Sequence, residues 1–381
     1  MKAGGIYIHI PFCRNKCIYC DFYSAGSRIA NWDNYILSLL KEVELRVPEV
    51  NFIPLTLYFG GGTPSLLPDK SLMSLIKGLA SFVNLDFVSE FTLEVNPEDV
   101  NEEKCRIWKE LGINRISIGI QSLNDAELKI IGRTHSSYQS FRALETLKKY
   151  FDNISVDLIF GIPGQNLITY TQSIDSILSF QPQHISCYSL MLEPNTALTL
   201  LVNQKRLTLP SEDLWLSMYD LTLRKLDENN FIRYEISNFS LEGFQSHHNS
   251  NYWTGGPYLG FGPSAHSYNG ENIRKSNPSD LKSYISYFSQ KGELWKNSSY
   301  ACIEELSTKE LQEEEIMMRL RTVKGLNLEE FASHFSEREK DRLISKTEKY
   351  KKEGLMKEEK GYLKFTNRGF MLSDSILVSL I

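Results

Sequence analysis

Apolar and polar positions follow a repeating order along the first 200 residues. Short runs rich in β-branched and aromatic residues, which are typical of strands, occur at 5–10, 55–60, 90–95, 115–121, 154–161 and 184–192. The segments between them place apolar residues every three or four positions, as amphipathic helices do, at 34–46, 70–82, 101–112, 140–150 and 171–180. Six such strand-then-helix units predict an α/β fold with a parallel sheet that is buried on both faces.

Chemically unusual residues follow the predicted strands at their C-terminal ends. A loop with three cysteines comes after the first strand, GGGTP (60–64) after the second and EVNPED (94–99) after the third. The fourth strand ends in Gln121, and the fifth runs through Asp157 into GIPGQ. Because βα folds build their sites at this end of the strands, the pattern favours a partial (β/α)6 barrel of the TIM type over a flat doubly wound sheet.

The repeating order changes after residue 200. One long amphipathic helix is predicted at 211–229 and one strand at 233–239, followed by a loop at 247–270 that is rich in Gly, Asn, His and aromatic residues. Turn-rich residues at 274–300 suggest a boundary zone. The last 81 residues hold charged helical runs and a hairpin-like piece, KEEKGYLKFTNRGF, in the order of a small winged-helix unit. We therefore predict three parts, namely a partial barrel (1–200), an extension that covers it (201–300) and a winged-helix-like α+β domain (301–381).

Composition and charge narrow the class of protein. The chain has 381 residues, of which 41% are hydrophobic and 23% charged, and its net charge is −5. The winged-helix-like segment carries 15 Lys and Arg against 16 Asp and Glu. Since nucleic-acid binding needs a basic surface, we expect no nucleic-acid partner. A covering or docking role suits this segment better.

Neither an export signal nor a membrane span is predicted. No charged start followed by an apolar stretch precedes the first strand, and nowhere do about 18 uncharged apolar residues run together. We expect a soluble, cytoplasmic protein. In that setting the clustered cysteines favour metal binding over disulfides. Cys105, Cys187 and Cys302 stand apart from the cluster and are predicted to be packing residues.

The three clustered cysteines are Cys13, Cys17 and Cys20, with spacings of four and three. Structural zinc sites need four ligands and usually draw their thiolates from two separated pairs. Iron–sulfur cubanes accept several thiolates from one loop. A cubane held by three thiolates leaves one iron open to a small chelating ligand, such as the amine and carboxylate of an amino acid. A zinc site and plain buried thiols are the alternatives.

A C-x3-C-x2-C loop at the end of a first barrel strand resembles the radical S-adenosylmethionine (SAM) superfamily. The resemblance implies a [4Fe–4S] cluster on Cys13, Cys17 and Cys20, with SAM on its open iron. It makes Tyr19 an aromatic neighbour of the adenine, and GGGTP the loop that grips the methionyl amine. Residues at the matching positions imply a larger set of SAM neighbours, namely Tyr7, Tyr19, Gly61, Gly62, Thr63, Glu94, Gln121, Arg133 and Asp157.

Longer motifs narrow the resemblance. YIHIPFC, GGGTPS, EVNPED, IGIQS, GRTH, DLIFGIPGQ and YSLMLEPNT together resemble the oxygen-independent coproporphyrinogen III oxidase group. This group comprises the HemN dehydrogenases and the related HemW heme chaperones, and the resemblance covers nearly the whole chain. Phe22 stands where the dehydrogenases carry a fourth cysteine, and only four residues precede the first strand, where the dehydrogenases have a long extension. Both features point away from the dehydrogenase branch.

The segment HNSNYW (248–253) resembles the HNxxYW motif of the chaperone branch. The resemblance implies that His248 is an axial heme ligand, with His247 as a substitute. Tyr252 and Trp253 offer flat apolar faces to a porphyrin. His9 and His266 are given structural roles. Heme and apo-hemoproteins such as respiratory enzymes are the partners that the resemblance implies.

Three functions stay open on the sequence. The first is a heme-trafficking protein that carries a [4Fe–4S] cluster and binds SAM and heme. The second is an enzyme that decarboxylates coproporphyrinogen III propionates by radical chemistry. The third is a radical SAM enzyme acting on another tetrapyrrole or small molecule. The sequence does not decide whether SAM is cleaved, or whether the protein docks transiently on a membrane to reach respiratory enzymes.

Overall fold

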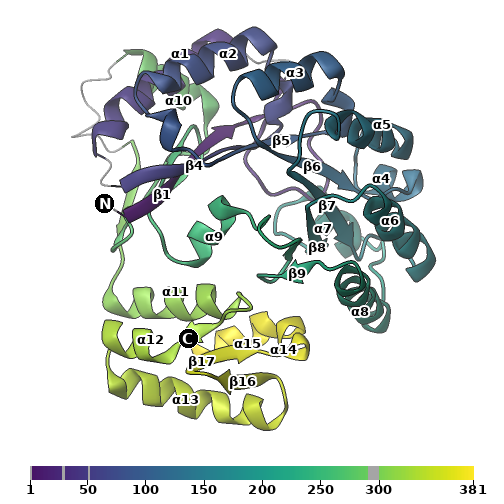
Figure 1. Ribbon diagram of the computed structural model, residues 1–381, viewed down its shortest axis with the longest axis vertical. Helices are drawn as coiled ribbons and strands as arrows, with labels where there is room; N and C mark the ends of the chain where they lie inside the picture. The colour runs from purple at the N-terminus through teal and green to yellow at the C-terminus, as the bar shows by residue number, and fades with distance from the viewer. Residues whose placement is uncertain (1, 28–30, 50–51, 291–299) are drawn as a thin grey trace.

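The computed structural model describes residues 2–27, 31–49, 52–290 and 300–381, and shows a large α/β unit with a smaller unit below it (Figure 1). A central sheet of 12 strands has the order β14-β13-β12-β11-β1-β4-β5-β6-β7-β8-β10-β9. Its six consecutive parallel strands coincide with the six predicted ones, namely β1 (Lys2–Ile10), β4 (Phe52–Gly61), β5 (Glu90–Val95), β6 (Arg115–Gln121), β7 (Ile154–Phe160) and β8 (His184–Ser189).

Helices pack on the outer face of this sheet. They confirm the predicted strand-then-helix order, with α1 (Trp32–Arg46), α2 (Asp69–Ala80), α3 (Glu102–Glu110), α5 (Ser137–Leu147) and α6 (Leu167–Ser179). Short helices lie between them, namely η2 (Val47–Glu49), η3 (Pro64–Leu66), η4 (Leu85–Phe87), η5 (Pro97–Asp99), α4 (Asp125–Ile130) and α7 (Ala197–Asn203).

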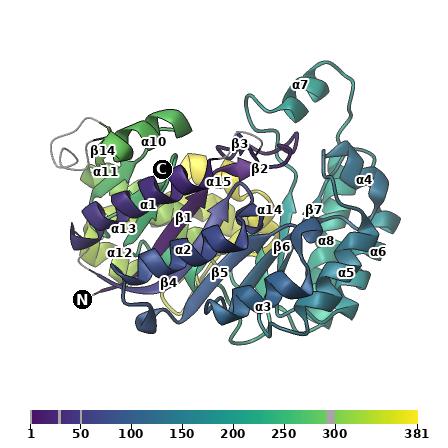
Figure 2. The same cartoon turned by 90° about the horizontal axis from the view of Figure 1, so that it is seen from above.

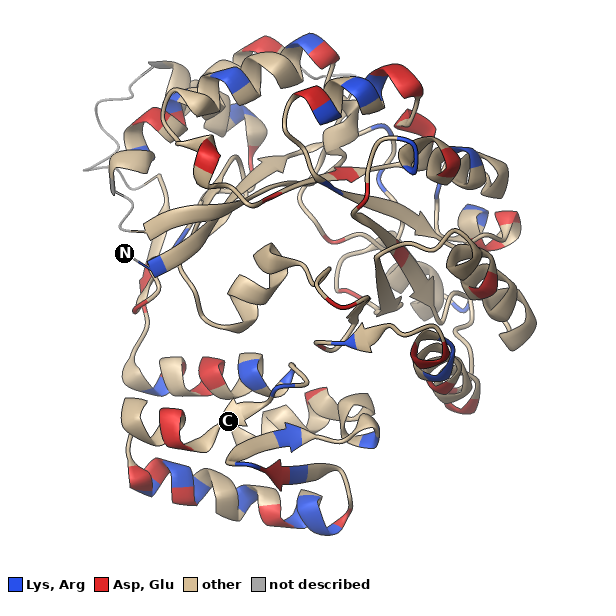
Figure 3. Ribbon diagram, viewed as in Figure 1, with Lys and Arg blue, Asp and Glu red and all other residues tan. Residues whose placement is uncertain are grey.

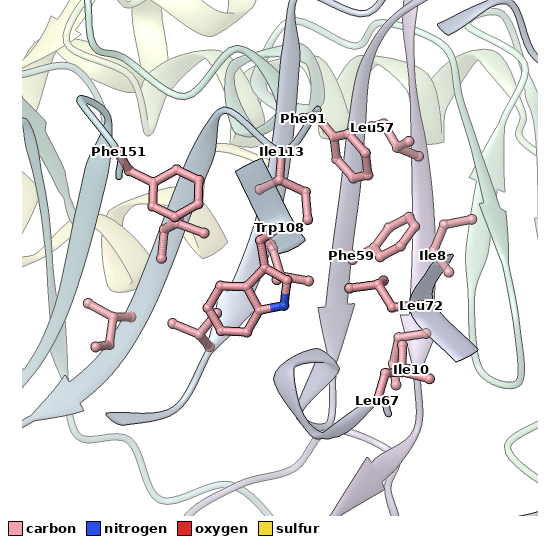
Figure 4. Close-up of a cluster of buried hydrophobic side chains, with 14 of the residues drawn as sticks. Ile8, Ile10, Leu57, Phe59, Leu67, Leu72, Phe91, Trp108, Ile113 and Phe151 are labelled. Carbon is pink, nitrogen blue, oxygen red and sulfur yellow. The ribbon is translucent and has the colours of Figure 1, made fainter. Parts of the chain in front are cut away.

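The period of two along each strand separates an apolar outer face from a polar inner face. Ile8 and Ile10 of β1 lie with Leu57 and Phe59 of β4 in one buried cluster, toward which Trp108 of α3 also points (Figure 4). The register pairs Ile8 with Phe59. The alternate positions of the same strands, which carry most of the polar residues, therefore face the inside of the sheet's curve.

The sheet continues past the parallel strands on both sides without closing. Next to β8 lie β10 (Asn238–Ser240) and β9 (Ile232–Arg233), both antiparallel to their neighbours. Next to β1 lie β11 (Tyr258–Phe261), which is parallel to β1, and then the antiparallel strands β12 (His266–Tyr268), β13 (Ile273–Ser276) and β14 (Cys302–Glu305). Because β9 and β14 are the two ends of the order, the barrel is incomplete, which confirms the predicted fold class.

The single strand predicted at 233–239 is wrong. The segment forms the tight hairpin of β9 and β10 instead, with Phe239 opposite Arg233. The Arg233 guanidinium donates to the backbone carbonyls of Glu235 and Ile236, at 3.0 and 2.6 Å. The Glu235 carboxylate accepts the Ser237 N–H at 3.2 Å. These bonds close a turn that the strand-like pattern of the segment does not reveal.

The other predictions for residues 201–305 have mixed outcomes. The long helix is confirmed as α8 (Glu212–Glu228). The turn-rich zone at 274–300 holds β13 and α10 (Leu281–Gln290), while 291–299 lie outside the described residues. Cys105 and Cys187 are buried as expected, whereas Cys302 is exposed because all four residues of the edge strand β14 are exposed.

The smaller unit has the predicted charged helices and hairpin, and adds a short strand, a helix between the two predicted ones and two helices after the hairpin. Its sheet has the order β15-β17-β16, and the β16–β17 hairpin turns through Lys360 and Gly361, both at positive φ. Its own buried cluster includes Phe331, Leu363 and Phe370. The elements are α11 (Thr308–Leu320), β15 (Leu326–Asn327), α12 (Leu328–His334), α13 (Glu337–Lys352), β16 (Met356–Glu359), β17 (Tyr362–Phe365), α14 (Asn367–Met371) and α15 (Ser373–Leu380).

Direct contacts attach the smaller unit to the larger one. Arg274 of β13 forms a two-bond ion pair with Glu314 of α11, at 2.5 and 2.9 Å. The Val323 N–H donates to the Tyr234 carbonyl at 3.1 Å. Between the units lies α9 (His247–Trp253), which packs on the inner side of β1 and β4 and against α11 (Figure 1). No helix among the described residues is long and apolar enough to span a membrane.

Candidate cofactor site

A cavity of about 610 Å³ opens at the C-terminal ends of the parallel strands. Seen from above, α7 and its flanking loops project beyond these ends, on the side of β2 (Phe12–Cys13) and β3 (Ala25–Gly26) (Figure 2). Eleven of the thirteen predicted site residues line the cavity, namely Cys13, Cys17, Tyr19, Cys20, Gly61, Gly62, Thr63, Glu94, Gln121, Arg133 and Asp157.

The cysteine loop is held at its base and near its middle. Phe12 is fully buried and packs edge-on against Trp32 and Tyr35 of α1, with ring centroids 4.5 and 5.3 Å away. Ile18 is bonded through its N–H to the Ile131 carbonyl at 3.3 Å, and its carbonyl accepts the Leu198 N–H at 2.8 Å. These contacts turn the loop toward the cavity.

Two of the three thiols have hydrogen-bond donors that would suit a thiolate. The Thr63 hydroxyl donates to Cys13 Sγ at 3.6 Å, and the Arg133 guanidinium donates to Cys17 Sγ at 3.7 Å. Burial raises the pKa of Cys13 and of Cys20. In the described part of the chain no three His, Cys, Asp or Glu residues already stand in a metal-binding arrangement. The donor set itself fits an iron–sulfur cluster, because three soft sulfur donors on one loop face one cavity.

The glycine loop packs directly on the backbone at the base of the cysteine loop. The Gly62 N–H donates to the Ile10 carbonyl and the Thr63 N–H to the Phe12 carbonyl, both at 2.8 Å. A Cβ on Gly62 would stand 2.8 Å from the Ile10 carbonyl oxygen and from Phe12 N and O. Gly61 has φ +106°, a conformation open to glycine. Only glycine at positions 61 and 62 therefore lets this loop pack so closely on the backbone of Ile10 and Phe12.

Replacing Gly62 by alanine is expected to loosen the cysteine loop. All three atoms that the new Cβ meets belong to the backbone, so side-chain movement cannot relieve the overlap, and overpacking of this kind costs about 1–3 kcal/mol. We expect a lower thermal midpoint together with weaker iron retention. Gly26→Ala in β3 is the matched control, since a Cβ at that position would have no other atom within 4 Å. Equal midpoints for the two variants would contradict this account of the loop.

Two partly buried carboxyl groups line the cavity, one on β5 and one on β7 with β6 between them. Glu94 Oε1 accepts from the Tyr58 hydroxyl at 2.7 Å, and Oε2 accepts from the Gly61 N–H at 3.1 Å. The Ser117 hydroxyl lies 3.2 Å from Asp157 Oδ2. Burial raises the pKa of Glu94 to about 7 and that of Asp157 to about 6. Desolvation makes the ionised form of these carboxylates less favourable. A cationic ligand bound in the cavity would stabilise that ionised form.

Gln121 and Arg133 meet on the far side of the cavity. Gln121 has φ +67° beside a register shift between β6 and β7, which is a strained conformation of the kind found at functional sites. Arg133 donates to the Gly119 carbonyl at 2.6 Å and to Asn96 Oδ1 at 2.8 Å. Its buried Nε has no partner in the structure. Asn96 also lines the cavity.

Some lining residues were not predicted from the sequence. Asn96 belongs to EVNPED, so its place at a strand end was the available signal. Ser117 of β6 donates to Asp157 of β7 at 3.2 Å, a contact that only the tertiary structure reveals. Tyr188 lies near the end of β8, and Glu193 follows that strand. Phe22 also lines the cavity and is 69% exposed, which places the position of the absent fourth cysteine at its mouth.

Tyr7 and His248 do not line the cavity but lie behind it, inside the barrel. The Tyr7 hydroxyl bonds to His9 Nδ1 at 3.1 Å. His248 is 2% exposed, and burial lowers its pKa to about 3. Its Nδ1 lies 2.7 Å from Thr56 Oγ1 and its Nε2 lies 2.9 Å from the Tyr252 hydroxyl. In this conformation neither ring nitrogen of His248 is free to bind a heme iron.

His248 touches the cavity indirectly. Its ring stacks on Tyr58 at 4.9 Å, and the Tyr58 hydroxyl bonds to Glu94. Gly5 makes room for the imidazole, because a Cβ there would stand 2.9 Å from His248 Nδ1. Glu90 holds the start of α9 by accepting the N–H groups of His247 and His248, at 2.7 and 2.9 Å. The inner side of α9 thus closes the barrel beneath the cofactor cavity.

Two family models match the chain, one in the larger unit and one in the smaller unit. The sequence model of the Radical SAM superfamily matches residues 7–177, and that of the HemN C-terminal domain matches residues 306–372. The heme chaperone HemW of Bacillus subtilis is 34% identical over 379 residues, which cover 99% of this chain and 98% of that protein. This chain belongs to the HemW family. The heme chaperone HemW of Lactococcus lactis is 36% identical, covering 88% of this chain and 86% of its own.

A solved structure shares the whole fold of this HemW family member. The coproporphyrinogen III oxidase HemN from Escherichia coli, described as a radical SAM enzyme, superposes with a TM-score of 0.83. The match covers 100% of this chain and 90% of that chain, at 21% identity. The fold is therefore common to both branches of the group. The curated relatives confirm the resemblance to the chaperone branch.

Proposed function

We propose that this HemW family member is a heme chaperone, which binds heme and delivers it to apo-hemoproteins such as respiratory enzymes. The observation that carries the proposal is the match of the chain over 99% of its length to a protein named a heme chaperone. The HNSNYW segment supports it, since it forms a helix of its own at the junction of the two units. A [4Fe–4S] cluster and SAM complete the set of proposed ligands.

The cavity residues divide into those that hold the cluster and those that hold SAM. Cys13, Cys17 and Cys20 supply the three thiolates, and the Arg133 guanidinium beside Cys17 offsets their charge. A bound cluster would supply an open iron for the amine and carboxylate of SAM and a source of one electron. Among the SAM contacts, Glu94 accepts the amine and the glycine loop exposes its backbone to the methionyl group, while Tyr19, Thr63, Gln121 and Asp157 complete the set.

Tyr7 and His248 have supporting roles in this proposal. Both lie behind the cavity, where His248 stacks on the tyrosine that bonds to Glu94.

We keep the three-part division at residues 200 and 300 as a functional proposal, although β14 carries the main sheet to Glu305. We also propose a cytoplasmic protein with no nucleic-acid partner, whose recipients dock on the smaller unit. Transient membrane association would be one route to respiratory recipients.

A second candidate function is oxidative decarboxylation of coproporphyrinogen III. The shared fold with the E. coli oxidase favours it. Phe22 counts against it, because the dehydrogenases that the sequence resembles carry a cysteine there. The two functions differ in what they do with a tetrapyrrole, since a chaperone returns it unchanged.

Both functions are tested by two anaerobic measurements on the reconstituted protein. We expect hemin to give a saturable Soret shift with one heme per chain, and apo-hemoprotein to remove that heme. We expect no protoporphyrinogen IX from coproporphyrinogen III with SAM and a reductant. Saturable hemin binding with transfer to a recipient supports the chaperone. Steady protoporphyrinogen formation, or no hemin complex, overturns it.

A further inference from the structure

Arg115, the first residue of β6, is buried inside the barrel. Most charged residues lie on the outer helices and on the smaller unit, whereas the central parallel strands carry few (Figure 3). Arg115 is 1% exposed. Ile116, Ile118 and Ile120 of the same strand belong to the apolar cluster between the sheet and its helices. Because the side chains of a strand alternate between its faces, the Arg115 side chain lies on the inner face.

The Arg115 guanidinium has no direct partner in the described part of the chain. Its buried Nε is without a hydrogen bond, and no described carboxylate forms an ion pair with it. Glu90, an inner carboxylate of β5, is occupied by the N–H groups at the start of α9. Other titratable side chains around the guanidinium are neutral at pH 7, since burial raises the pKa of the tyrosines and lowers that of the histidines. They are Tyr58, Tyr234, His184 and His248.

The two cavity carboxylates stand on the strands that flank Arg115. β6 lies between β5, which carries Glu94, and β7, which carries Asp157. Arg115 is paired with Thr92, two positions before Glu94. Ser117, two positions after Arg115, is paired with Glu94 and donates to Asp157 Oδ2 at 3.2 Å. The arginine therefore shares the inner face with both carboxylates and lies nearer the start of the strands.

Charge links the arginine to both carboxylates. Burial raises the pKa of Glu94 to about 7 and that of Asp157 to about 6, and the positive charge of Arg115 opposes both increases. The Tyr58 hydroxyl and the Gly61 N–H also favour ionised Glu94, whereas the charge of Asp157 disfavours it. A buried cation is costly unless negative charge lies nearby, so the arginine and the ionised carboxylates stabilise one another.

The remaining neighbours of the two carboxylates come from several elements. Hydrogen bonds from Ser186 and Ser117 and the charge of Arg133 favour ionised Asp157. Of these groups only Arg133 is a cation, and it is already bonded to Gly119 and Asn96. The other titratable groups that face the carboxylates are Tyr7, Tyr252, Cys187 and Tyr188.

We propose that Arg115 is a positioning residue for SAM, which keeps Glu94 and Asp157 ionised so that they accept the amine N–H groups and offset the sulfonium charge. The inference rests on the proposed function and adds to it a residue that does not line the cavity. Because the sulfonium of SAM is positive, a cation beside it would repel it. A cation behind the carboxylates keeps them charged and leaves the cavity free for the ligand.

The pH dependence of SAM binding tests the proposal on the full-length, anaerobically reconstituted protein. We expect Arg115→Gln to bind SAM about tenfold more weakly at pH 7. The difference from the wild type should shrink as the pH rises to 8.5, because the carboxylates then ionise without the arginine. Arg115→Lys keeps the charge and should restore the wild-type profile, and Arg142→Gln on α5 is the control for loss of an exposed arginine. A loss of affinity that is equal at every pH indicates packing alone and overturns the proposal.

Difference infrared spectroscopy reads the carboxyl groups directly, on the same protein without SAM or heme. The protonated carboxyl of Glu94 is assigned by its absence from Glu94→Gln. In Arg115→Gln it should lose its proton at a proton concentration about tenfold lower than in the wild type. Arg115→Met, which keeps the apolar part of the side chain, takes its place if Arg115→Gln does not fold. An unchanged midpoint overturns the proposal.

The two measurements separate failure of this inference from failure of the SAM site. A wild type that binds no SAM, although the titration of Glu94 depends on Arg115, overturns the proposed SAM site and keeps the effect of the arginine on the carboxylate. A wild type and an Arg115→Gln variant that bind SAM with the same pH profile overturn the role of Arg115 and leave the SAM site intact.

Discussion

Replacing Cys13, Cys17 and Cys20 together by serine is expected to remove the iron–sulfur cluster entirely. Iron content after anaerobic reconstitution should fall from about four atoms per chain to nearly none. Serine keeps the size of the side chain but offers a hard oxygen where iron–sulfur clusters need a thiolate. Iron and sulfide analysis together with Mössbauer spectroscopy measures the loss.

The chain provides its own control for this experiment. Cys302 is exposed on the edge strand β14, which lies at one end of the central sheet. Cys302→Ser should therefore keep its full iron content. A triple variant that still holds a four-iron centre would refute the assignment of these thiols, and with it the proposed place of SAM.

Glu94→Gln is expected to weaken SAM binding by about 10- to 100-fold. Glu94 is partly buried and accepts two hydrogen bonds, from the Tyr58 hydroxyl and from the Gly61 N–H, so it is fixed in place before the ligand arrives. Hydrogen bonds to charged groups contribute about 1.5–3 kcal/mol, and 1.4 kcal/mol corresponds to a factor of ten. Isothermal titration calorimetry under anaerobic conditions gives the two affinities.

The same variant should also change the pH dependence of binding. Burial raises the pKa of Glu94 to about 7, while Arg115 nearby acts in the opposite direction. The amine N–H groups donate to Glu94 only when its carboxylate is ionised, so wild-type affinity should rise as the pH increases from 6 to 7.5. Glu94→Gln should be flatter and keep only the contribution of Asp157, whose raised pKa is about 6.

Glu103→Gln, an exposed glutamate on α3, is the matched control for the loss of one carboxylate. It should reproduce both the wild-type affinity and the wild-type pH profile. If Glu94→Gln binds SAM as tightly as the control at every pH, Glu94 is not the amine acceptor.

The sequence predicted most of the cavity because of one property of parallel βα units. Their strands point the same way, so the residues that follow each strand meet at one edge of the sheet. Cys17, Gly62, Glu94, Arg133 and Asp157 are far apart in the chain yet line one cavity. Loop residues that need an unusual backbone conformation also follow these strands, so the sequence indicated them as well. Gly61, at φ +106°, is one of them.

Predictions failed where contacts between distant segments decide the structure. The segment around Glu235 has the composition of one strand but folds into a hairpin, because the Arg233 side chain binds its backbone carbonyls. The strand β11 was hidden in a glycine-rich loop, and its pairing with β1 supplies the order that its composition lacks. Cys302 was expected to be buried, but lies on an exposed edge strand.

The sequence by itself determined the alternating βα order, the thiol cluster and the winged-helix-like unit, since each depends on local periodicity, spacing and turn residues. Only the tertiary structure decided which face of α9 looks outward. The helix is short, and its periodicity does not decide which of its two histidines points inward. Gly5, Thr56 and Tyr58 provide a fitted space for the ring of His248. That space buries one histidine and leaves His247 exposed.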